Sequence, residues 1–477
     1  MKEQIKEVLE KNKQKIINLS DEIWKFAEVG FKEFKSSELY VELLEEEGFK
    51  VEKGIAGMPT GFKAVYGHGK PVIGLLAEYD ALPGLSQKAG QTKKERDLTQ
   101  LDGAGHGCGH NGIGAGVFAA ALAVKEYLKG NEDKGTVIVF GCPSEEKGDG
   151  KTIMAREGCF NGIDTAFTWH PGNINMIWNM GTLANISVYF SFTGKTAHAA
   201  MNPEEGRSGL DAVELMNVGA NYLREHIPSD ARIHYAYIDV GGNAPNVVQD
   251  YAKVHYFIRS PKAKQVLEIY ERVQDIAKGA ALMTGTESKC ELYAGLSDFI
   301  PNATMSQVLY ESVCEMGLPE FSEEDFKLAY EFFHNTYTEE IVDRNKQELI
   351  KKYGSEKGQE KIKRPIDTEI LPFEISDKIM SGSTDVGDVS YVVPTAQILL
   401  SPFAFNTVLH TWQATAQMNT EAAHKVILSA GAAMAMAVIK VFEQPELCKK
   451  AKEELLTATN GEYICPIPKE IGPQLEG

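Results

Sequence analysis

Hydrophobic positions in the first part of the chain follow two different periods. Residues 1–47 carry apolar side chains at helical spacing among lysines and glutamates, which predicts two amphipathic helices. Residues 72–77, 136–140 and 165–169 are short continuous apolar runs, as in strands that are buried on both faces. A helix rich in small residues is expected between the first two runs, at 114–128. This order predicts an open α/β sheet, whose functional sites form where the strands end.

The pattern changes near residue 181. Apolar and polar residues then alternate in three segments, as in antiparallel strands with one face in solvent, and two further segments have helical spacing. The alternating segments are 183–193, 232–238 and 252–258, and the helical ones are 209–226 and 262–284. We therefore expect an inserted α+β domain at 181–295, within a larger domain formed by 1–180 and 296–477. Residues 319–372 are highly charged, which predicts a helical excursion from the larger domain.

Composition restricts the class of partner. The chain has 477 residues, of which 43% are hydrophobic, and a formal net charge of −18. A nucleic acid or an anionic membrane is therefore not an expected partner, because phosphate binding requires a basic surface. The sequence has no apolar run of the roughly 20 residues that a membrane span requires and no apolar leader segment. Its seven scattered cysteines fit a reducing compartment, so we expect a cytoplasmic protein.

The candidate chemistry centres on residues 105–111, Gly-His-Gly-Cys-Gly-His-Asn. Glu145 and Glu146 follow the second apolar run, His170 follows the third, and His410 lies far downstream. Thiol, imidazole and carboxylate are the ligands that suit zinc or a similar divalent ion. Each residue alone is often an ordinary buried or surface residue, but their occurrence at successive strand ends favours a metal-dependent hydrolase. Two adjacent glutamates can then divide the work of holding a metal and accepting a proton from water.

Two other interpretations compete with this one. A Cys–His nucleophilic enzyme is an alternative because Cys108 lies two residues from both His106 and His110, although it leaves the glutamate pair without a purpose. Residues 107–112 also match the dinucleotide fingerprint G-x-G-x-x-G. The preceding residues are polar rather than a strand, so the context that this fingerprint requires is missing.

The order of several motifs resembles the M20 metallopeptidase family, in particular its amidohydrolase branch and the aminobenzoyl-glutamate hydrolase group within it. The motifs are Gly-His-Gly-Cys-Gly-His-Asn (105–111), Cys-Pro-Ser-Glu-Glu (142–146), Thr-Trp-His-Pro-Gly (168–172), Gly-Lys-Thr-Ala-His-Ala-Ala (194–200) and Leu-His-Thr-Trp-Gln (409–413). Further likeness at 206–216, 383–390 and 465–469 extends the resemblance over nearly the whole chain. It implies an M20-like catalytic α/β domain with a mixed sheet flanked by helices, interrupted by an α+β lid or dimerisation domain.

The resemblance also implies a site with two divalent metal ions, zinc or manganese. The residues that match the family's metal ligands are Cys108, His110, Glu146, His170 and His410. Glu145 matches the general base, and His198 matches a histidine that stabilises the oxyanion, often from a partner chain. Asn246 and Arg259 resemble the residues that hold the carboxylate of the substrate.

The sequence departs from the family pattern at two places. Asn111 stands where many relatives of this branch have aspartate, and Glu78-Tyr-Asp80 stands where other M20 peptidases have a His-x-Asp metal motif. We expect Asp80 and Asn111 to support the ligands, while the role of Glu78 stays open. Asp385 and Asp388 are expected either to support the site or to cap a turn.

These features lead to one expected function and several alternatives. The expected function is metal-dependent hydrolysis of an N-acyl bond to an amino acid, with p-aminobenzoyl-glutamate as the first substrate to consider. A dipeptidase or aminoacylase of the same family is an alternative, and so is a non-catalytic partner in a heteromeric hydrolase. The expected assembly is a dimer, formed with a second copy or with a related chain.

Overall fold

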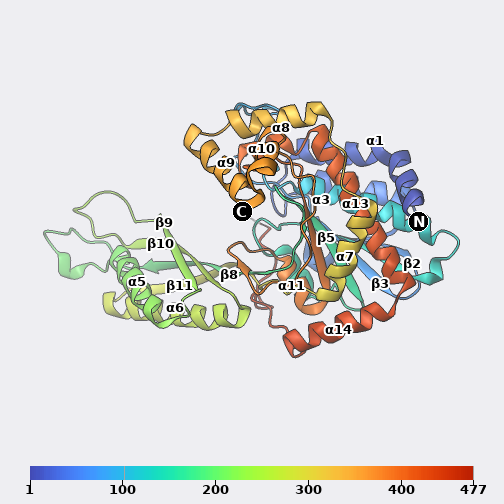
Figure 1. Ribbon diagram of the computed structural model, residues 1–477. Helices are drawn as coiled ribbons and strands as arrows, with labels where there is room; N and C mark the ends of the chain where they lie inside the picture. Colours follow the sequence, from blue (N-terminus) through green and yellow to red (C-terminus); the bar gives the residue numbers. More distant parts are fainter. Residues whose placement is uncertain (101–102, 476–477) are drawn as a thin grey trace.

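The computed structural model describes residues 1–100 and 103–475 (Figure 1). Its fold is built around two separate β-sheets, one of seven and one of four strands. The larger sheet has seven strands in the order β1-β2-β4-β3-β5-β13-β6. Its strands are β1 (Lys50–Lys53), β2 (Phe62–Gly67), β3 (Val72–Ala77), β4 (Thr136–Gly141), β5 (Thr165–Pro171), β6 (Met176–Ile177) and β13 (Thr395–Leu400). The central strands β4, β3, β5 and β13 are parallel, whereas β1, β2 and β6 pair antiparallel at the two sides. The predicted α/β class with a mixed sheet is therefore confirmed, and the carboxyl ends of four strands meet at one edge.

Helices cover both faces of the large sheet. One face packs against a helical layer that shares one hydrophobic core with it, and the other face packs against two short helices. The first layer comprises α1 (Lys2–Phe26), α2 (Phe34–Glu46), α3 (His110–Leu128), α7 (Ala303–Met316), α13 (Glu421–Glu443) and α14 (Glu446–Thr459). The short helices are α4 (Gly150–Arg156) and α11 (Val386–Val392). The apolar strands of this sheet are buried on both faces because both faces carry helices.

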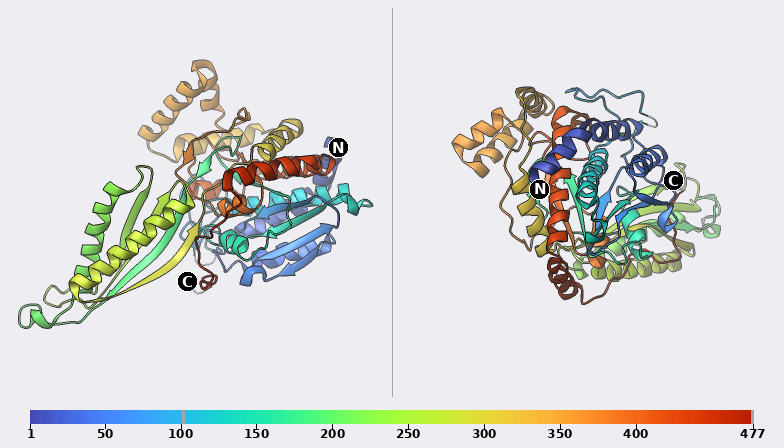
Figure 2. Two further views of the ribbon diagram at one scale, coloured as in Figure 1. Left: turned by 90° about the horizontal axis from the view of Figure 1, so that it is seen from below. Right: turned by 90° about the vertical axis from the view of Figure 1, so that its right-hand side faces the viewer.

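The second sheet has four antiparallel strands in the order β11-β8-β10-β9. Its strands are β8 (Ala184–Thr193), β9 (Arg232–Asp239), β10 (Tyr251–Ser260) and β11 (Glu287–Leu296), and α5 (Gly209–Leu223) and α6 (Ala263–Thr284) pack on one face. This unit is elongated and projects from the larger one (Figures 1 and 2). Its elements span 184–296, close to the expected insertion at 181–295, which as a domain division stays a prediction. A short pairing of β7 (Gly181–Thr182) with β12 (Ile379–Met380) lies at its base.

The charged segment at 319–372 contains helices, as expected. They are α8 (Glu323–Asn335), α9 (Glu339–Tyr353) and α10 (Ser355–Lys363), which lie together at the top of Figure 1. Phe326, Phe332 and Phe333 form a small core with residues of the segment 404–422. The excursion is therefore packed onto the part of the chain that precedes and follows His410.

Helix α13 corrects the expectation that no stretch is apolar enough for a membrane span: it has the required length and hydropathy, but 78% of its most apolar stretch is buried within the protein. It packs against α3 and α7 as a core helix. Small residues permit the close approach of α3 and α13, because a Cβ added at Gly431 would lie 2.5 Å from the Cβ of Ala119. Gly116 similarly leaves room for the indole of Trp169. This spacing matters for the site, since α3 begins at His110.

We expect Gly431→Ala to lower the free energy of unfolding by up to about 2 kcal/mol. The added methyl group overpacks the contact with α3 at a typical cost of about 1–3 kcal/mol, against a gain in helix propensity of about 1 kcal/mol. Gly279→Ala in α6 is the matched control, because a Cβ there meets nothing within 4 Å. That change should leave stability equal or slightly higher. Urea denaturation of the two variants checks this, and equal effects would contradict the packing argument.

Candidate functional site

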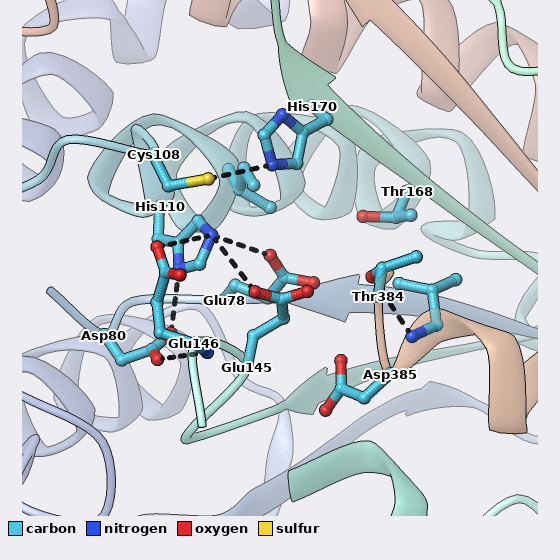
Figure 3. Close-up of polar contacts among 12 residues, drawn as sticks. Glu78, Asp80, Cys108, His110, Glu145, Glu146, Thr168, His170, Thr384 and Asp385 are labelled. Carbon is cyan, nitrogen blue, oxygen red and sulfur yellow. Dashed lines mark hydrogen bonds and ion pairs between the residues drawn. The ribbon is translucent and has the colours of Figure 1, made fainter. Parts of the chain in front are cut away.

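The carboxyl edge of the large sheet brings together side chains from four parts of the chain (Figure 3). Strand β3 is followed by Glu78 and Asp80, β4 by Glu145 and Glu146, and β5 carries His170 near its end. His110 begins α3, and Cys108 lies in the turn before it. The buried strands therefore end at this edge, and the polar residues that follow them lie close together there, as the sequence predicted.

Hydrogen bonds fix the orientation of two histidines. His110 donates from Nδ1 to the Asp80 carboxylate at 2.8 Å, and His170 donates from Nδ1 to the Pro171 carbonyl at 2.8 Å. Both partners can only accept, so each ring presents an unprotonated Nε2 when the imidazole is neutral. The Nε2 of His170 lies 3.5 Å from the sulfur of Cys108 (Figure 3). A carboxylate or carbonyl behind the ring is the arrangement that orients metal-ligating histidines.

The predicted metal ligands, together with the predicted base Glu145, form three overlapping groups, and within each group the atoms that could bind a metal lie within 4.8 Å of one another. The groups are Cys108, His110 and His170; Cys108, Glu146 and His410; and His110, Glu145 and Glu146. Nε2 of His110 and Oε1 of Glu146 are buried and have no hydrogen-bond partner among the described residues. Unpartnered buried polar atoms are costly unless something else binds them. The donor set and these two atoms therefore fit bound divalent cations.

His410 reaches the cluster from a strained backbone conformation. Its φ is +62°, a left-handed value that costs a residue with a Cβ roughly 1–3 kcal/mol. Its backbone N–H donates to the Gly107 carbonyl at 2.8 Å, and its Nε2 lies 3.4 Å from a carboxylate oxygen of Glu146. The imidazole is 55% exposed, so this side of the cluster is open to solvent.

The two glutamates differ in their surroundings. The backbone N–H of Glu146 donates to Asp80, and its carboxylate lies between His110 and His410. Burial raises the pKa of Glu146 to about 7. Burial, with the Glu78 and Asp385 carboxylates nearby, raises the pKa of Glu145 well above its usual range. Glu145 lies 3.8 Å from Nε2 of His110. Glu146 thus contacts two candidate ligands, His110 and His410, and Glu145 faces the cluster beside them.

A buried ion triad was missed by the sequence analysis. Nζ of Lys151 lies 2.7 Å from Glu78 and 2.6 Å from Asp385, and none of the three side chains is more than 3% exposed. The other oxygen of Glu78 faces Nε2 of His110 at 3.5 Å. Asp385 bonds Lys151 rather than capping α11, so it supports the site. Lys151 follows Gly148-Asp-Gly, and nothing in that polar segment marks it as buried.

The surroundings of Cys108 differ from those of an activated nucleophile. Burial and the Glu146 carboxylate raise the pKa of its thiol, whereas catalytic cysteines have a lowered pKa. A divalent cation bound beside it favours the thiolate as a ligand. His106 does not join the cluster, because it is buried and donates from Nε2 to the Ile23 carbonyl. These contacts favour the metal interpretation of the segment.

His198 and Asn246, which were expected to contact the substrate, lie together on the small unit but not at the cluster. Ala199 N–H donates to the Asn246 carbonyl, and His198 forms a β-bridge with Val247. The segments 194–207 and 240–250 form the end of the small unit that is farthest from the large sheet (Figures 1 and 2). Nδ1 of His198 accepts from the N–H groups of Ala200 and Met201, so the neutral ring carries its proton on an outward Nε2.

Arg259 lies at the base of the small unit. Its Nη1 donates to the Ser381 carbonyl at 3.4 Å, while its Nε is buried without a partner in the described chain. Asn185 is opposite Arg259 in the β10–β8 register, and its Oδ1 is likewise unpartnered, as is the hydroxyl of Ser383. These last two residues carry no recognisable signal in the sequence. Together the three side chains offer unsatisfied polar atoms where the two units join.

Two residues expected to support the site have other contacts. Asn111 donates to the Ser20 hydroxyl and the Met418 carbonyl, which connects α3 to α1 and to the end of α12 (Trp412–Gln417). Asp388 accepts from Thr152 and Ser297, and so joins α4 to the chain that leaves β11. Both residues therefore hold elements around the site together.

Three comparisons place this geometry among known proteins. Residues 74–336 match the family model of peptidase family M20/M25/M40. The chain is 43% identical over 474 residues to a chain of the p-aminobenzoyl-glutamate hydrolase of Escherichia coli, covering 98% of both chains. It is 27% identical to Xaa-Arg dipeptidase of Mus musculus, covering 96% of this chain and 94% of that protein.

Solved structures show the same fold at low sequence identity. The aminobenzoyl-glutamate utilization protein of Klebsiella pneumoniae has a TM-score of 0.61 at 17% identity, covering 91% of this chain and 98% of that one. A dinuclear metal-binding peptidase of Bacillus subtilis has a TM-score of 0.56 at 16% identity, covering 90% and 99%. The chain therefore belongs to peptidase family M20/M25/M40 and is an amide-bond hydrolase.

Proposed function

We propose that the chain hydrolyses the amide bond between an acyl group and an amino acid, with p-aminobenzoyl-glutamate as its substrate. The observation that carries the proposal is the pair Glu145–Glu146 beside Cys108, His110 and His170 at one sheet edge. The substrate is suggested by the name of the Escherichia coli relative at 43% identity. The seven free cysteines support a cytoplasmic location as part of the same proposal.

We propose that two divalent cations, zinc or manganese, occupy the cluster. The proposed ligands are Cys108, His110, Glu146, His170 and His410, and the Bacillus subtilis neighbour is described as dinuclear. When bound, such ions would lower the pKa of water to about 7 and polarise the carbonyl that is attacked. Asp80 supports the donor set from behind by fixing the proton of His110 on Nδ1.

Glu145 is the proposed general base. Its carboxylate faces the cluster, and its position next to Glu146 keeps it within reach of a water molecule bound there. It takes a proton from the attacking water and delivers it to the departing amine, so that one residue serves both halves of the reaction. Nε2–H of His198 is the proposed donor to the oxyanion, and Arg259 with Asn246 is proposed to hold the carboxylate of the amino acid.

A dimer places these groups at one site. His198 and Asn246 lie at the far end of the small unit, so they serve the cluster of a second chain more readily than their own. β9 is an edge strand with exposed Tyr237 and Ile238, and such edges pair with other chains. The Escherichia coli relative is named as one subunit of a hydrolase, which also supports a complex with a related chain.

The first test is release of p-aminobenzoate from p-aminobenzoyl-glutamate by the chain reconstituted with manganese or zinc. We expect turnover that a chelator abolishes. Glu145→Gln should reduce kcat by at least about 10²–10⁴-fold with metal content unchanged, because it removes the proton acceptor but no proposed ligand. Glu52→Gln, on an exposed strand, is the control that should match the wild type.

Other results of this test point to other functions. Turnover of dipeptides or other acyl-amino acids without release of p-aminobenzoate would assign the chain to the dipeptidase or aminoacylase alternative. Full metal occupancy without turnover of any substrate would assign it to the non-catalytic partner alternative. Failure to bind metal would contradict the central proposal.

A mixed dimer tests where His198 acts. Chains carrying His198→Ala and Glu145→Gln are co-expressed with different affinity tags, and only species that carry both tags are purified. If His198 serves the partner chain, one of the two sites is complete and about half the wild-type turnover returns. If His198 serves its own chain, both sites are defective and no turnover returns. The two variants purified alone are the controls.

A further inference from the structure

The turn that carries the two glutamates contains a strained residue. Ser144 lies between β4 and Glu145, is fully buried, and has a φ of +60°. A residue with a Cβ in this region costs roughly 1–3 kcal/mol and persists only when its surroundings enforce it. The side chain of Ser144 donates to Asp149 at 3.0 Å, but this bond holds only the hydroxyl group. Another contact must hold the backbone.

Two acidic residues clamp the backbone on both sides of Glu145. The N–H of Ser144 donates to Oε1 of Glu33 at 2.9 Å, and the N–H of Glu146 donates to Oδ2 of Asp80 at 2.9 Å. Oε2 of Glu33 accepts from the hydroxyl of Thr60 at 2.8 Å, which fixes the Glu33 carboxyl group itself. Ser144 and Glu145 are therefore the two residues between the anchored peptide groups, and Glu33 supplies one of the anchors from a distant part of the sequence.

The loop before Glu33 is built to approach this turn. A Cβ added at Gly30 would lie 2.7 Å from Oγ of Ser144, so only glycine permits the contact. Phe31 in the same loop has a φ of +64°, and Lys147 lies over its ring at 5.6 Å. The loop between α1 and α2 thus packs directly on the turn that contains Glu145.

We propose that Glu33 is a positioning residue that holds Ser144 in its left-handed conformation and thereby aims the carboxylate of Glu145. This inference rests on the proposed role of Glu145 as general base. Glu33 is fully buried, and burial, together with the Asp80 carboxylate, raises its pKa to about 8. A neutral amide of the same shape can therefore replace it, since Oε1 of a glutamine still accepts from Ser144.

The test compares Glu33→Ala with Glu33→Gln in the hydrolysis of p-aminobenzoyl-glutamate by metal-reconstituted protein. We expect Glu33→Ala to lower kcat about 10²-fold with little change in KM or in bound metal per chain, because a displacement of about 1 Å has an effect of that size. Glu33→Gln should retain kcat close to the wild type. A purely structural role would instead lower stability without separating kcat from KM.

A second substitution tests the strain directly. Adding Ser144→Gly to Glu33→Ala should restore much of kcat, because glycine adopts a positive φ without strain. Adding Ser144→Ala instead should restore nothing, since it removes the hydroxyl but keeps the Cβ. Gly30→Ala is the independent variant, and should lower kcat in the same way if Glu33→Ala fails to fold.

The outcome is separable from that of the proposed function. Wild-type kcat in Glu33→Ala, with Glu145→Gln inactive, would overturn the positioning role and leave the function intact. If the wild type hydrolyses no amide, the proposed function fails, and the crystal structure of Glu33→Ala still decides the role of Glu33. A positive φ at Ser144 with Glu145 unmoved would overturn it, and a relaxed turn would support it.

Discussion

Burial of like charge at one sheet edge is the constraint on which the site depends. Glu78, Asp80, Glu145, Glu146 and Asp385 all lie there with little or no exposure to solvent. An unpaired buried charge costs several kcal/mol, so the protein must supply cations or protons to this edge. The fully buried Lys151 pairs two of the carboxylates, and His110 contacts a third. The charge of Glu145 and Glu146 is left for protons or for the proposed divalent cations, so the excess of carboxylates at this edge favours a cationic cofactor.

The sequence predicts those parts of the site that depend on local pattern. Apolar runs ending in polar residues place Glu145 and His170 at strand ends, as the structure has them. Such predictions succeed because a buried strand and its end are recognisable from a few consecutive residues. The strand Lys50–Lys53 was not predicted, since it is short and mostly polar and lies at the side of the sheet. Glu33 and Lys151 were missed for a related reason. Their roles arise from contacts with residues more than 100 positions away, which no local pattern records.

The proposed metal ligands and the proposed substrate-binding residues lie on different parts of the fold. The proposed ligands lie on the large sheet and its adjoining loops, where buried strands and the α3–α13 contact fix their positions. The proposed substrate contacts at His198 and Asn246 lie on the far loops of the second sheet, and among the described residues these loops contribute to no hydrophobic core cluster. The proposed chemistry and recognition are thus separated in space, and the proposed assembly with another chain would join them. A site of this kind can change substrate by altering the lid while leaving the ligand set unchanged.

His410 shows why the charged excursion at 319–372 belongs to the site. Its strained backbone lies in a loop that the large sheet alone does not enclose, since the side chain remains half exposed. Asn406 donates to the Phe333 carbonyl and Gln413 donates to the Thr336 carbonyl, so bonds to the end of α8 hold this loop on both sides of His410. Strain persists only where the surroundings enforce it. The excursion therefore acts as a support that keeps His410, the last proposed ligand in the sequence, directed at Glu146.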